Sequence, residues 1–293
     1  MKRYILLVVC LVLILSCVGC FQEHLEVDNN EIFIGEPKAT QEPVEPTLDV
    51  KGTKEPRPTP SDDALPGPTP SEPVTQEPEP TPTTGGLSLS GYVIGIDPGH
   101  QLHGNSAKEP VLPGSNEMKS KVTSGTQGIW TKTPEYEVNL RVGMILKELL
   151  EQQGATVIMT REVNDVDISN VERAQLFNKK KTDYALRLHC NGSEDRSING
   201  AFMLIPTKNP YLENCSRAAE LLIREYCKET GAKNLGVVKR GDQTGFNWCE
   251  RMIINIEMGH MSNEAEDYNL SDPDYQVKMA QGLLNGILAY FKG

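Results

Sequence analysis

The chain has 293 residues and a formal net charge of −11, and the charge is unevenly distributed. Positions 23–82 carry 14 acidic and 4 basic residues, whereas positions 83–293 carry 26 acidic and 23 basic residues. The acidity therefore belongs to the N-terminal segment. The rest of the chain lacks the basic surplus of a nucleic-acid-binding domain, so we expect no nucleic-acid partner.

The first residues have the pattern of an export signal. A short basic start precedes the apolar run at positions 5–16, which is shorter than the roughly 18 residues expected of a spanning helix. A small residue precedes both Cys17 and Cys20, as cleavage before a lipid-modified cysteine requires. We predict a lipoprotein-like signal peptide over residues 1–20, with Cys20 favoured, or alternatively an uncleaved N-terminal anchor. Both predict an extracytoplasmic chain held at the membrane and facing the cell wall.

Residues 21–88 are acidic and rich in proline and threonine, with almost no aromatic side chains. Such a segment cannot bury enough apolar surface to offset the entropy lost on ordering. We therefore predict a disordered linker over residues 21–88 and a folded domain over residues 89–293.

The folded domain opens with a predicted strand at residues 92–98, which the turn Asp97-Pro98-Gly99 ends just before His100. Residues 101–132 have no sustained period and predict a long loop. Apolar residues then recur at helical spacing up to Gly154, and a second strand follows at residues 155–160. This order of strand, loop, helix and strand is typical of a parallel sheet.

The remaining elements continue the alternation and predict a single three-layer α/β domain, in which helices flank a mostly parallel twisted sheet. They are a helix at 170–179 capped by Ser169 or Asn170, a strand at 183–188, a strand at 200–205, a helix at 210–230, a glycine-containing loop at 233–246, a strand at 251–257 and a helix at 273–291.

The four cysteines of the predicted domain, Cys190, Cys215, Cys227 and Cys249, are widely spaced. They could pair in an oxidising compartment. A domain of about 200 residues buries a sufficient core without such links, so no particular disulfide is predicted.

Two histidines, His100 and His189, follow separate predicted parallel strands, so both can reach the same edge of the sheet. A catalytic zinc takes three protein ligands from histidine and carboxylate side chains and leaves the fourth position to water. Glu135 is the best third candidate, although a carboxylate at a helix start can equally serve to complement the helix dipole. His103 could replace His100 as a ligand, and His260 could point at substrate, but a solvated loop position and a packing role are the simpler interpretations.

Glu257 ends an apolar run, where an unpaired carboxylate is costly to bury. One interpretation is a structural ion pair with Arg187 or Arg251. The other is a general base beside the metal site, whose partly desolvated setting raises its pKa.

Four motifs in order resemble the zinc-dependent N-acetylmuramoyl-L-alanine amidases of the type 3 domain. They are Ile94-Gly95-Ile96-Asp97-Pro98-Gly99-His100, Glu135-Tyr136-Glu137-Val138-Asn139-Leu140, Arg187-Leu188-His189-Cys190-Asn191-Gly192 and Ile256-Glu257-Met258-Gly259-His260-Met261-Ser262-Asn263. The resemblance covers residues 91–292. It implies a zinc ion held by His100, Glu135 and His189, with Glu257 as the catalytic carboxylate. We expect a monomer that acts on peptidoglycan.

The chain departs from the family pattern directly after His100. Gln101 stands where the family commonly has glycine and could narrow the mouth of the site, and the interval to Glu135 is longer than usual. We expect that residues 101–134 could gate the site. Cys190 replaces a smaller residue and is expected only to pack.

The resemblance implies hydrolysis of the amide between N-acetylmuramic acid and the L-alanine of the stem peptide. Another zinc hydrolase, acting on cell-wall peptides or amino sugars, would use similar ligands, but the His-Glu-x-x-His motif of the commonest metalloproteases is absent from the sequence. A non-catalytic wall-binding lipoprotein is the second alternative, which the presence of Glu257 disfavours.

Overall fold

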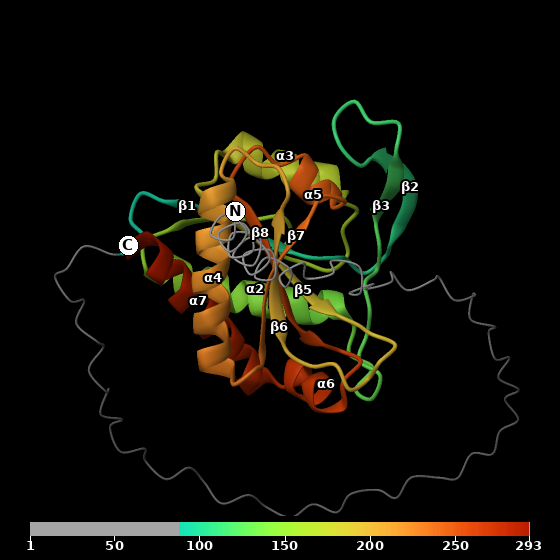
Figure 1. Cartoon of the computed structure of the whole chain (residues 1–293), viewed down its shortest axis with the longest axis vertical. Helices are drawn as coiled ribbons and strands as arrows, with labels where there is room; N and C mark the ends of the chain where they lie inside the picture. The colour runs from blue at the N-terminus through green and yellow to red at the C-terminus, as the bar shows by residue number, and fades with distance from the viewer. Residues whose placement is uncertain (1–87, 293) are drawn as a thin grey trace, which may run out of the picture. The chain divides into compact units, whose positions relative to one another are not determined.

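The computed structural model describes residues 88–292, and the predicted signal and linker lie outside this part of the chain, apart from residue 88 (Figure 1). Six strands form one sheet in the order β4-β1-β5-β8-β6-β7, and β2 pairs with β3 in a separate two-stranded sheet. The strands are β1 (Val93–Pro98), β2 (Asn105–Pro110), β3 (Met118–Val122), β4 (Thr156–Met159), β5 (Tyr184–Asn191), β6 (Ala201–Pro206), β7 (Asn234–Arg240) and β8 (Ile253–His260). The helices are α2 (Glu135–Gln152), α3 (Asn170–Lys180), α4 (Leu212–Thr230), α5 (Thr244–Asn247), α6 (Glu264–Ser271) and α7 (Pro273–Lys292).

The main sheet is mostly parallel. β1 pairs in parallel with β4 and β5, and β5 pairs in parallel with β8. β6 runs antiparallel to β8, and β7 runs parallel to β6. The carboxyl ends of β4, β1, β5 and β8 therefore meet at one edge of the sheet. The predicted single α/β domain with helices flanking a mostly parallel sheet is confirmed.

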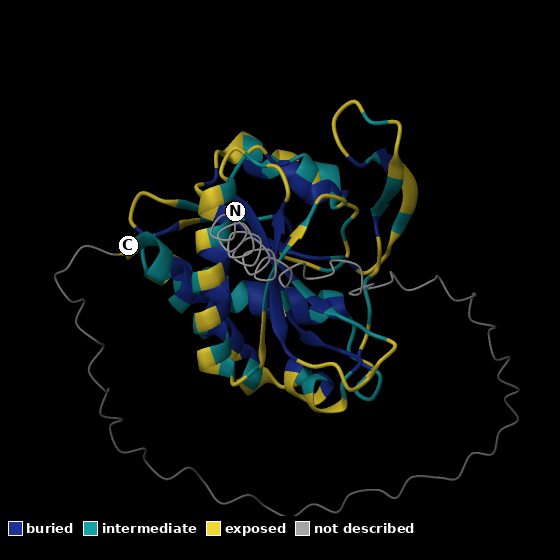
Figure 2. Cartoon of the chain, viewed as in Figure 1, coloured by how far each residue is buried: buried dark blue, intermediate teal, exposed yellow. Residues whose placement is uncertain are grey.

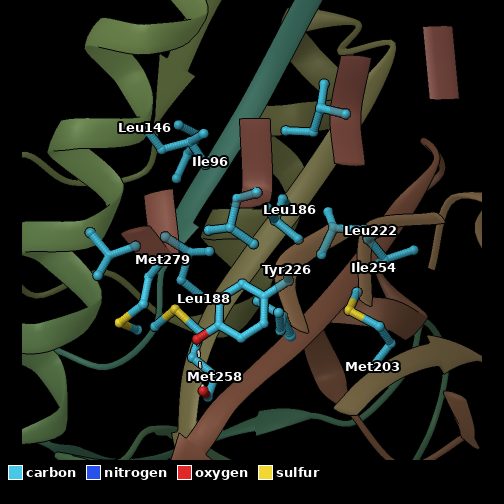
Figure 3. Close-up of a cluster of buried hydrophobic side chains, with 14 of the residues drawn as sticks. Ile96, Leu146, Leu186, Leu188, Met203, Leu222, Tyr226, Ile254, Met258 and Met279 are labelled. Carbon is cyan, nitrogen blue, oxygen red and sulfur yellow. Dashed lines mark hydrogen bonds between the residues drawn. The ribbon is translucent and has the colours of Figure 1, made fainter. Parts of the chain in front are cut away.

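Helices cover both faces of the sheet, and the central strands are buried on both. α7 packs against α2 and α4, which also contact the sheet, and these three helices share one hydrophobic cluster with alternate residues of β1, β5 and β8. α3 packs with the short α5 and contacts β1. Figure 3 shows part of the cluster, in which the Tyr226 hydroxyl donates a 2.8 Å hydrogen bond to the Met258 carbonyl. The labelled cluster residues are Ile96, Leu146, Leu186, Leu188, Met203, Leu222, Tyr226, Ile254, Met258 and Met279.

Pleating sends the other residues of the same strands towards the α3 side. Asp97 of β1 and Arg187 of β5 are paired register partners and form an ion pair on this side. His189 lies two residues beyond Arg187 on β5, and Glu257 lies two residues beyond Asn255 on β8. Both side chains therefore point to the α3 side as well. The α3 side of the sheet at its carboxyl edge is therefore polar, while the opposite side is packed with aliphatic side chains.

Two of the predicted loops contain strands. Residues 101–132 contain the β2–β3 hairpin, and residues 233–246 contain β7 and α5. Both hairpin strands and β7 are largely exposed or half-buried, and Figure 2 shows the hairpin mostly in yellow and teal. β2 and β3 consist mostly of polar residues, and the apolar residues of β7 do not alternate with polar ones, so the sequence gave no strand pattern. The short helix α6 was also missed.

The helix boundaries agree with the sequence to within about two residues. Ser169 caps α3 in a capping box with Glu172, as predicted for one of the two candidate caps. The four cysteines of the domain, Cys190, Cys215, Cys227 and Cys249, are all free thiols. Within residues 88–292, no helix is both long and apolar enough to cross a membrane.

Candidate metal centre

Three of the predicted site residues meet at the carboxyl edge of the parallel strands. His100 lies two residues after β1, His189 lies near the end of β5, and Glu135 is the first residue of α2. His189 Nδ1 is 3.1 Å from His100 Nε2 and 3.2 Å from Glu135 Oε1. His100 Nε2 is 3.2 Å from the same Glu135 oxygen. The three atoms form a nearly equilateral triangle.

The Glu135 carboxylate is fixed by donors from three segments. Its Oε2 accepts a 2.9 Å hydrogen bond from the Thr126 backbone, and its Oε1 accepts a 3.0 Å bond from the Cys190 backbone. Asn139, one turn further along α2, donates to Oε1 at 3.3 Å and to the Gly99 carbonyl at 3.2 Å. The side chain is buried, so these contacts hold it at one position.

His100 is oriented by the end of the long insertion. Its φ is +60°, in the left-handed region that histidine tolerates better than most residues, and this turns the side chain back over the sheet edge. His100 Nδ1 is 2.9 Å from the Thr123 carbonyl, which can only accept, so Nδ1 carries the proton. His100 Nε2 is left with a lone pair that faces Glu135 and His189, in the arrangement typical of metal-bound histidines.

The His189 ring lies directly against the backbone of Gly99. A Cβ built on Gly99 would approach His189 Cε1 to 2.2 Å and Nε2 to 2.4 Å, so only glycine leaves room for this ring position. His189 Nε2 is buried with no hydrogen-bond partner. The ring is thus held by packing on one side, while its other nitrogen faces His100 and Glu135.

The charge states of the three groups suit a cation. Burial lowers the pKa of His189 to about 4, so this imidazole is neutral. Burial alone would raise the pKa of Glu135, but His100 and His189 hold it well below its usual range. A buried carboxylate oxygen and the nitrogens His100 Nε2 and His189 Nδ1 therefore face a common point.

Glu257 lies on β8 as the register partner of His189, and its side chain points to the same face of the sheet. Its Oε1 accepts a 3.0 Å hydrogen bond from Asn255 Nδ2. Burial and the nearby charge of Glu135 raise the pKa of Glu257 to about 8. A cation held by the three neighbouring ligand atoms would oppose the second effect.

The alternative role predicted for Glu257, an ion pair with Arg187 or Arg251, is wrong. Arg187 Nε instead pairs with Asp97 at 2.8 Å, and Arg251 Nε donates to the Thr182 carbonyl at 2.7 Å. The ion pairs found among residues 88–292 do not include Glu257. Its carboxylate is held by an amide and remains available for proton transfer.

A buried network that the sequence analysis missed supports the His100 turn. Asp97 pairs with Arg173 at 2.7 Å as well as with Arg187, and Thr160 donates to it at 2.7 Å. These partners hold the pKa of Asp97 well below its usual range, although burial alone would raise it. Asp97 therefore connects β1, α3 and β5 beneath the site. The signal for this network was the Asp97-Pro98-Gly99 turn itself, because a carboxylate buried at a strand end requires cationic partners.

Arg161 forms a second brace, which the sequence also gave no reason to select. Its guanidinium donates to the carbonyls of Pro98 and Gly99 at 2.8 and 3.0 Å and to the Tyr136 carbonyl at 2.8 Å. It thereby ties the turn before His100 to the first turn of α2, which carries Glu135.

The rival histidines are not part of the cluster. His103 is exposed. His260 is buried, with Nε2 3.1 Å from Asn191 Nδ2 and Nδ1 3.1 Å from the Gly200 carbonyl, so its role is packing and hydrogen bonding.

Gln101 does not narrow the mouth of the site. Its side chain is completely buried, and its Oε1 accepts hydrogen bonds from Ile168 and Arg173 at the start of α3. Gln101, which stands where the family commonly has glycine, therefore stabilises the start of α3 and the segment before it. Cys190 is also buried, and its Sγ lies 3.7 Å from Asn139 Oδ1, as a packing role requires.

The triangle of ligand atoms fits zinc. Bonds of 2.0–2.1 Å in tetrahedral geometry place neighbouring ligand atoms about 3.3 Å apart, and the observed separations are 3.1–3.2 Å. Among the histidine, cysteine and acidic side chains of residues 88–292, the group found close enough together to hold an ion is that of His100, Glu135 and His189. Two nitrogens and one carboxylate oxygen form the donor set of an open zinc site.

Comparison with known proteins identifies relatives with this fold. The sequence model described as N-acetylmuramoyl-L-alanine amidase matches residues 94–289. The germination-specific N-acetylmuramoyl-L-alanine amidase of Bacillus subtilis is 27% identical over 221 residues, which are 70% of this chain and 82% of that protein. An N-acetylmuramoyl-L-alanine amidase of Mycobacterium tuberculosis is 23% identical over 69% of this chain and 88% of its own length.

Solved structures show the same fold. The apo form of an N-acetylmuramyl-L-alanine amidase from Mycobacterium abscessus superposes with a TM-score of 0.63 at 24% identity, covering 69% of this chain and 99% of that one. An N-acetylmuramoyl-L-alanine amidase from Clostridium difficile 630 superposes with a TM-score of 0.58 at 21% identity, covering 69% and 97%. The family model leaves residues 1–93 and 290–293 of this chain outside its match.

Proposed function

The chain belongs to the N-acetylmuramoyl-L-alanine amidase family, and on that premise we propose that it is a zinc-dependent hydrolase of the amide between N-acetylmuramic acid and L-alanine in peptidoglycan. The observation that carries the zinc proposal is the triangle formed by His100 Nε2, Glu135 Oε1 and His189 Nδ1. These three atoms would hold the ion. When bound, zinc would polarise the amide carbonyl and lower the pKa of the attacking water.

Glu257 is the proposed general base and acid. Strand spacing places it about 4.8 Å from the neighbouring strand that carries His189, on the same face of the sheet. With Oε1 held by Asn255, Oε2 is the atom we assign to proton transfer. It accepts a proton from the attacking water and returns it to the nitrogen of L-alanine as the carbon–nitrogen bond breaks. A pKa raised by burial makes this carboxylate a stronger base than an exposed one.

The other polar residues at the site hold the proposed ligands in position. Asn139 and the backbone donors hold the Glu135 carboxylate, and the Thr123 carbonyl fixes the tautomer of His100. The Asp97 and Arg161 networks fix the turn that delivers His100. The reacting groups are therefore preorganised by the fold.

We further propose that the chain acts outside the cytoplasm, attached to the membrane by a lipid on Cys20 or Cys17 or by an uncleaved anchor. The linker at 21–88 would give the catalytic domain, 89–293, reach into the wall. Support comes from the signal-like sequence and from relatives that include probable cell wall amidases of Staphylococcus species.

Digestion of purified peptidoglycan by the full chain, with and without a chelator, tests the proposal. We expect new free amino groups on L-alanine, loss of activity with chelator and recovery on adding zinc. Mass analysis of the products separates the alternatives: released acetate would indicate a deacetylase, cleavage between amino acids would indicate a peptidase, and intact material would indicate a binding protein. Any of these three results would contradict the amidase proposal.

A further inference from the structure

A shallow groove of about 530 Å³ is lined by none of the candidate metal ligands and has no role in the proposed hydrolysis. It is lined by Trp130, Arg196, Asn263, Glu264, Ala265 and Tyr268. Tyr268 is 55% exposed although it is a large aromatic side chain. The Arg196 guanidinium lies 5.8 Å from the centre of the Trp130 ring. Two aromatic rings, one cation and one anion thus share a concave surface.

Three segments of the chain connect the lining of the groove to the candidate site. Residues 191–196 follow His189, residues 260–268 follow Glu257, and residues 126–131 precede Glu135. The segments are hydrogen-bonded to one another: the backbone N–H groups of residues 129 and 193 donate to residues 261 and 262, and Asn263 Nδ2 donates to the Arg196 carbonyl at 2.9 Å. Figure 1 shows α6 beside the yellow loop that follows β5. A long substrate at the metal centre would therefore pass over this groove.

The turn that carries Trp130 is held rigidly from beneath. Asp267 is completely buried. Its Oδ2 accepts hydrogen bonds from the Trp130 and Thr131 backbones at 2.7 and 3.1 Å, and its Oδ1 accepts a bond from the Thr131 hydroxyl. Ser271 also donates to that hydroxyl at 3.0 Å. A buried carboxylate with three donors therefore fixes the backbone of the turn from which the partly exposed Trp130 side chain projects.

The charges of the groove favour a neutral ligand. Arg196 and Glu264 have opposite charges and are both exposed. Glu266 is turned inward, where it accepts bonds from the backbones of Gly200 and His260 at 2.8 and 2.7 Å. The two charges offset each other, so neither an anion nor a cation is favoured, whereas a sugar could receive hydrogen bonds from Arg196, donate to Glu264 and stack on the rings.

We infer that this groove binds the N-acetylated amino sugars of the glycan strand next to the muramic acid whose amide is cut. The inference rests on the proposed function, since it names the part of the substrate that extends from the site. Trp130 and Tyr268 supply the stacking surfaces, and Arg196 and Glu264 bind hydroxyl and acetamido groups. Asn263 positions the Arg196 loop.

Tryptophan fluorescence of the full chain tests the inference directly. The chain has two tryptophans, so a Trp248→Phe background leaves Trp130 as the reporter. The probes are an N-acetylglucosamine tetramer, which lacks the scissile amide, and a soluble stem peptide. We expect a saturable change with the sugar only, and binding about tenfold weaker after Tyr268→Ala, in line with the loss of one aromatic contact.

Arg196→Ala is the second variant and should also weaken sugar binding, because its exposed side chain can be removed without disturbing the core. Tyr211→Ala is the matched control, since Tyr211 is 37% exposed and lies 5.6 Å from an arginine, Arg251, far from the groove lining. A change with the stem peptide alone, no saturable change with either probe, or equal weakening by Tyr211→Ala would overturn the inference. Sugar binding without amidase activity would contradict only the proposed function, and activity without sugar binding would contradict only this inference.

Discussion

Gly99→Ala should abolish metal binding without changing a ligand. The added Cβ would lie 2.2 Å from His189 Cε1, 2.4 Å from Nε2 and 2.7 Å from Nδ1, whereas ordinary contacts begin at 3.4 Å. The strands cannot separate to make room, because the Gly99 N–H donates to the Leu188 carbonyl at 2.9 Å beside them. The ring must move instead.

The required displacement is large on the scale of metal coordination. Relief of the shortest contact needs a shift of about 1.2 Å in the His189 ring. Metal–ligand distances tolerate only about 0.2 Å, so His189 would no longer complete the triangle with His100 and Glu135. Loss of a supporting partner alone costs about 10–100-fold in metal affinity, and we expect a loss of more than about 100-fold here. Overpacking costs about 1–3 kcal/mol, which a domain with about 5–15 kcal/mol of stability survives.

Zinc affinity is measured by competition with a chromophoric chelator, alongside circular dichroism and urea unfolding. Gly259→Ala is the control, because its Cβ would meet Leu270 at 3.4 Å, an ordinary contact. We expect wild-type zinc affinity in the control and a folded but zinc-deficient Gly99→Ala protein. Wild-type zinc affinity in folded Gly99→Ala would refute the placement of the His189 ring against Gly99 and its role as a ligand.

Two further substitutions test separate parts of the site. The Glu257→Gln variant should keep its zinc content, because Glu257 is outside the ligand triangle, and its activity should fall by about 10²–10⁴-fold, as expected for removal of a general base. Metal analysis and amine release measure the two effects. Substantial residual activity would contradict the mechanism. Asp97→Asn should lower the free energy of unfolding by about 3–5 kcal/mol near pH 7, because Arg173 and Arg187 lose their buried partner. Since the folded-state pKa of Asp97 is depressed, its stabilisation is present above the unfolded pKa of about 4 and is lost as the pH falls towards the folded value. Urea unfolding should therefore show the gap between wild type and Asp97→Asn narrowing by about 1.4 kcal/mol per pH unit below about pH 4, and a constant gap would exclude this ionisation.

The sequence was most informative where both faces of a strand are buried. β1, β5 and β8 were predicted as strands from short segments rich in apolar residues, which are buried because helices cover both sides of the sheet. The β2–β3 hairpin and β7 were read as loops for the opposite reason. All three are largely exposed or half-buried and lack a regular alternation of apolar and polar residues, so neither period nor composition indicated a strand.

The proposed metal ligands could be predicted from the sequence, but most of the residues that hold them in position could not. His100 and His189 could be placed at one sheet edge from strand order. Glu135 was the best third candidate from its place at the start of the next helix, and the motif resemblance supported that choice. Asn139 lies one turn beyond Glu135 and was detectable as a polar residue on the same helix face. The contact of Arg161 with Pro98, Gly99 and Tyr136 was not detectable, because it depends on three carbonyls brought together only by the folded chain.

The wide separation of the proposed ligands along the chain would make metal loading a late event in folding. His100 and His189 are 89 residues apart, and Glu135 is 54 residues from His189. An unfolded chain would pay a large loop-closure entropy to gather them, so the ion binds almost entirely to molecules whose β1, β5 and α2 have already assembled. By mass action, free zinc at about 100 times its dissociation constant would then add about 2.7 kcal/mol to the stability of the native state. The proposed zinc ion would therefore stabilise folded molecules and not unfolded ones. Zinc uptake could then be used to follow refolding.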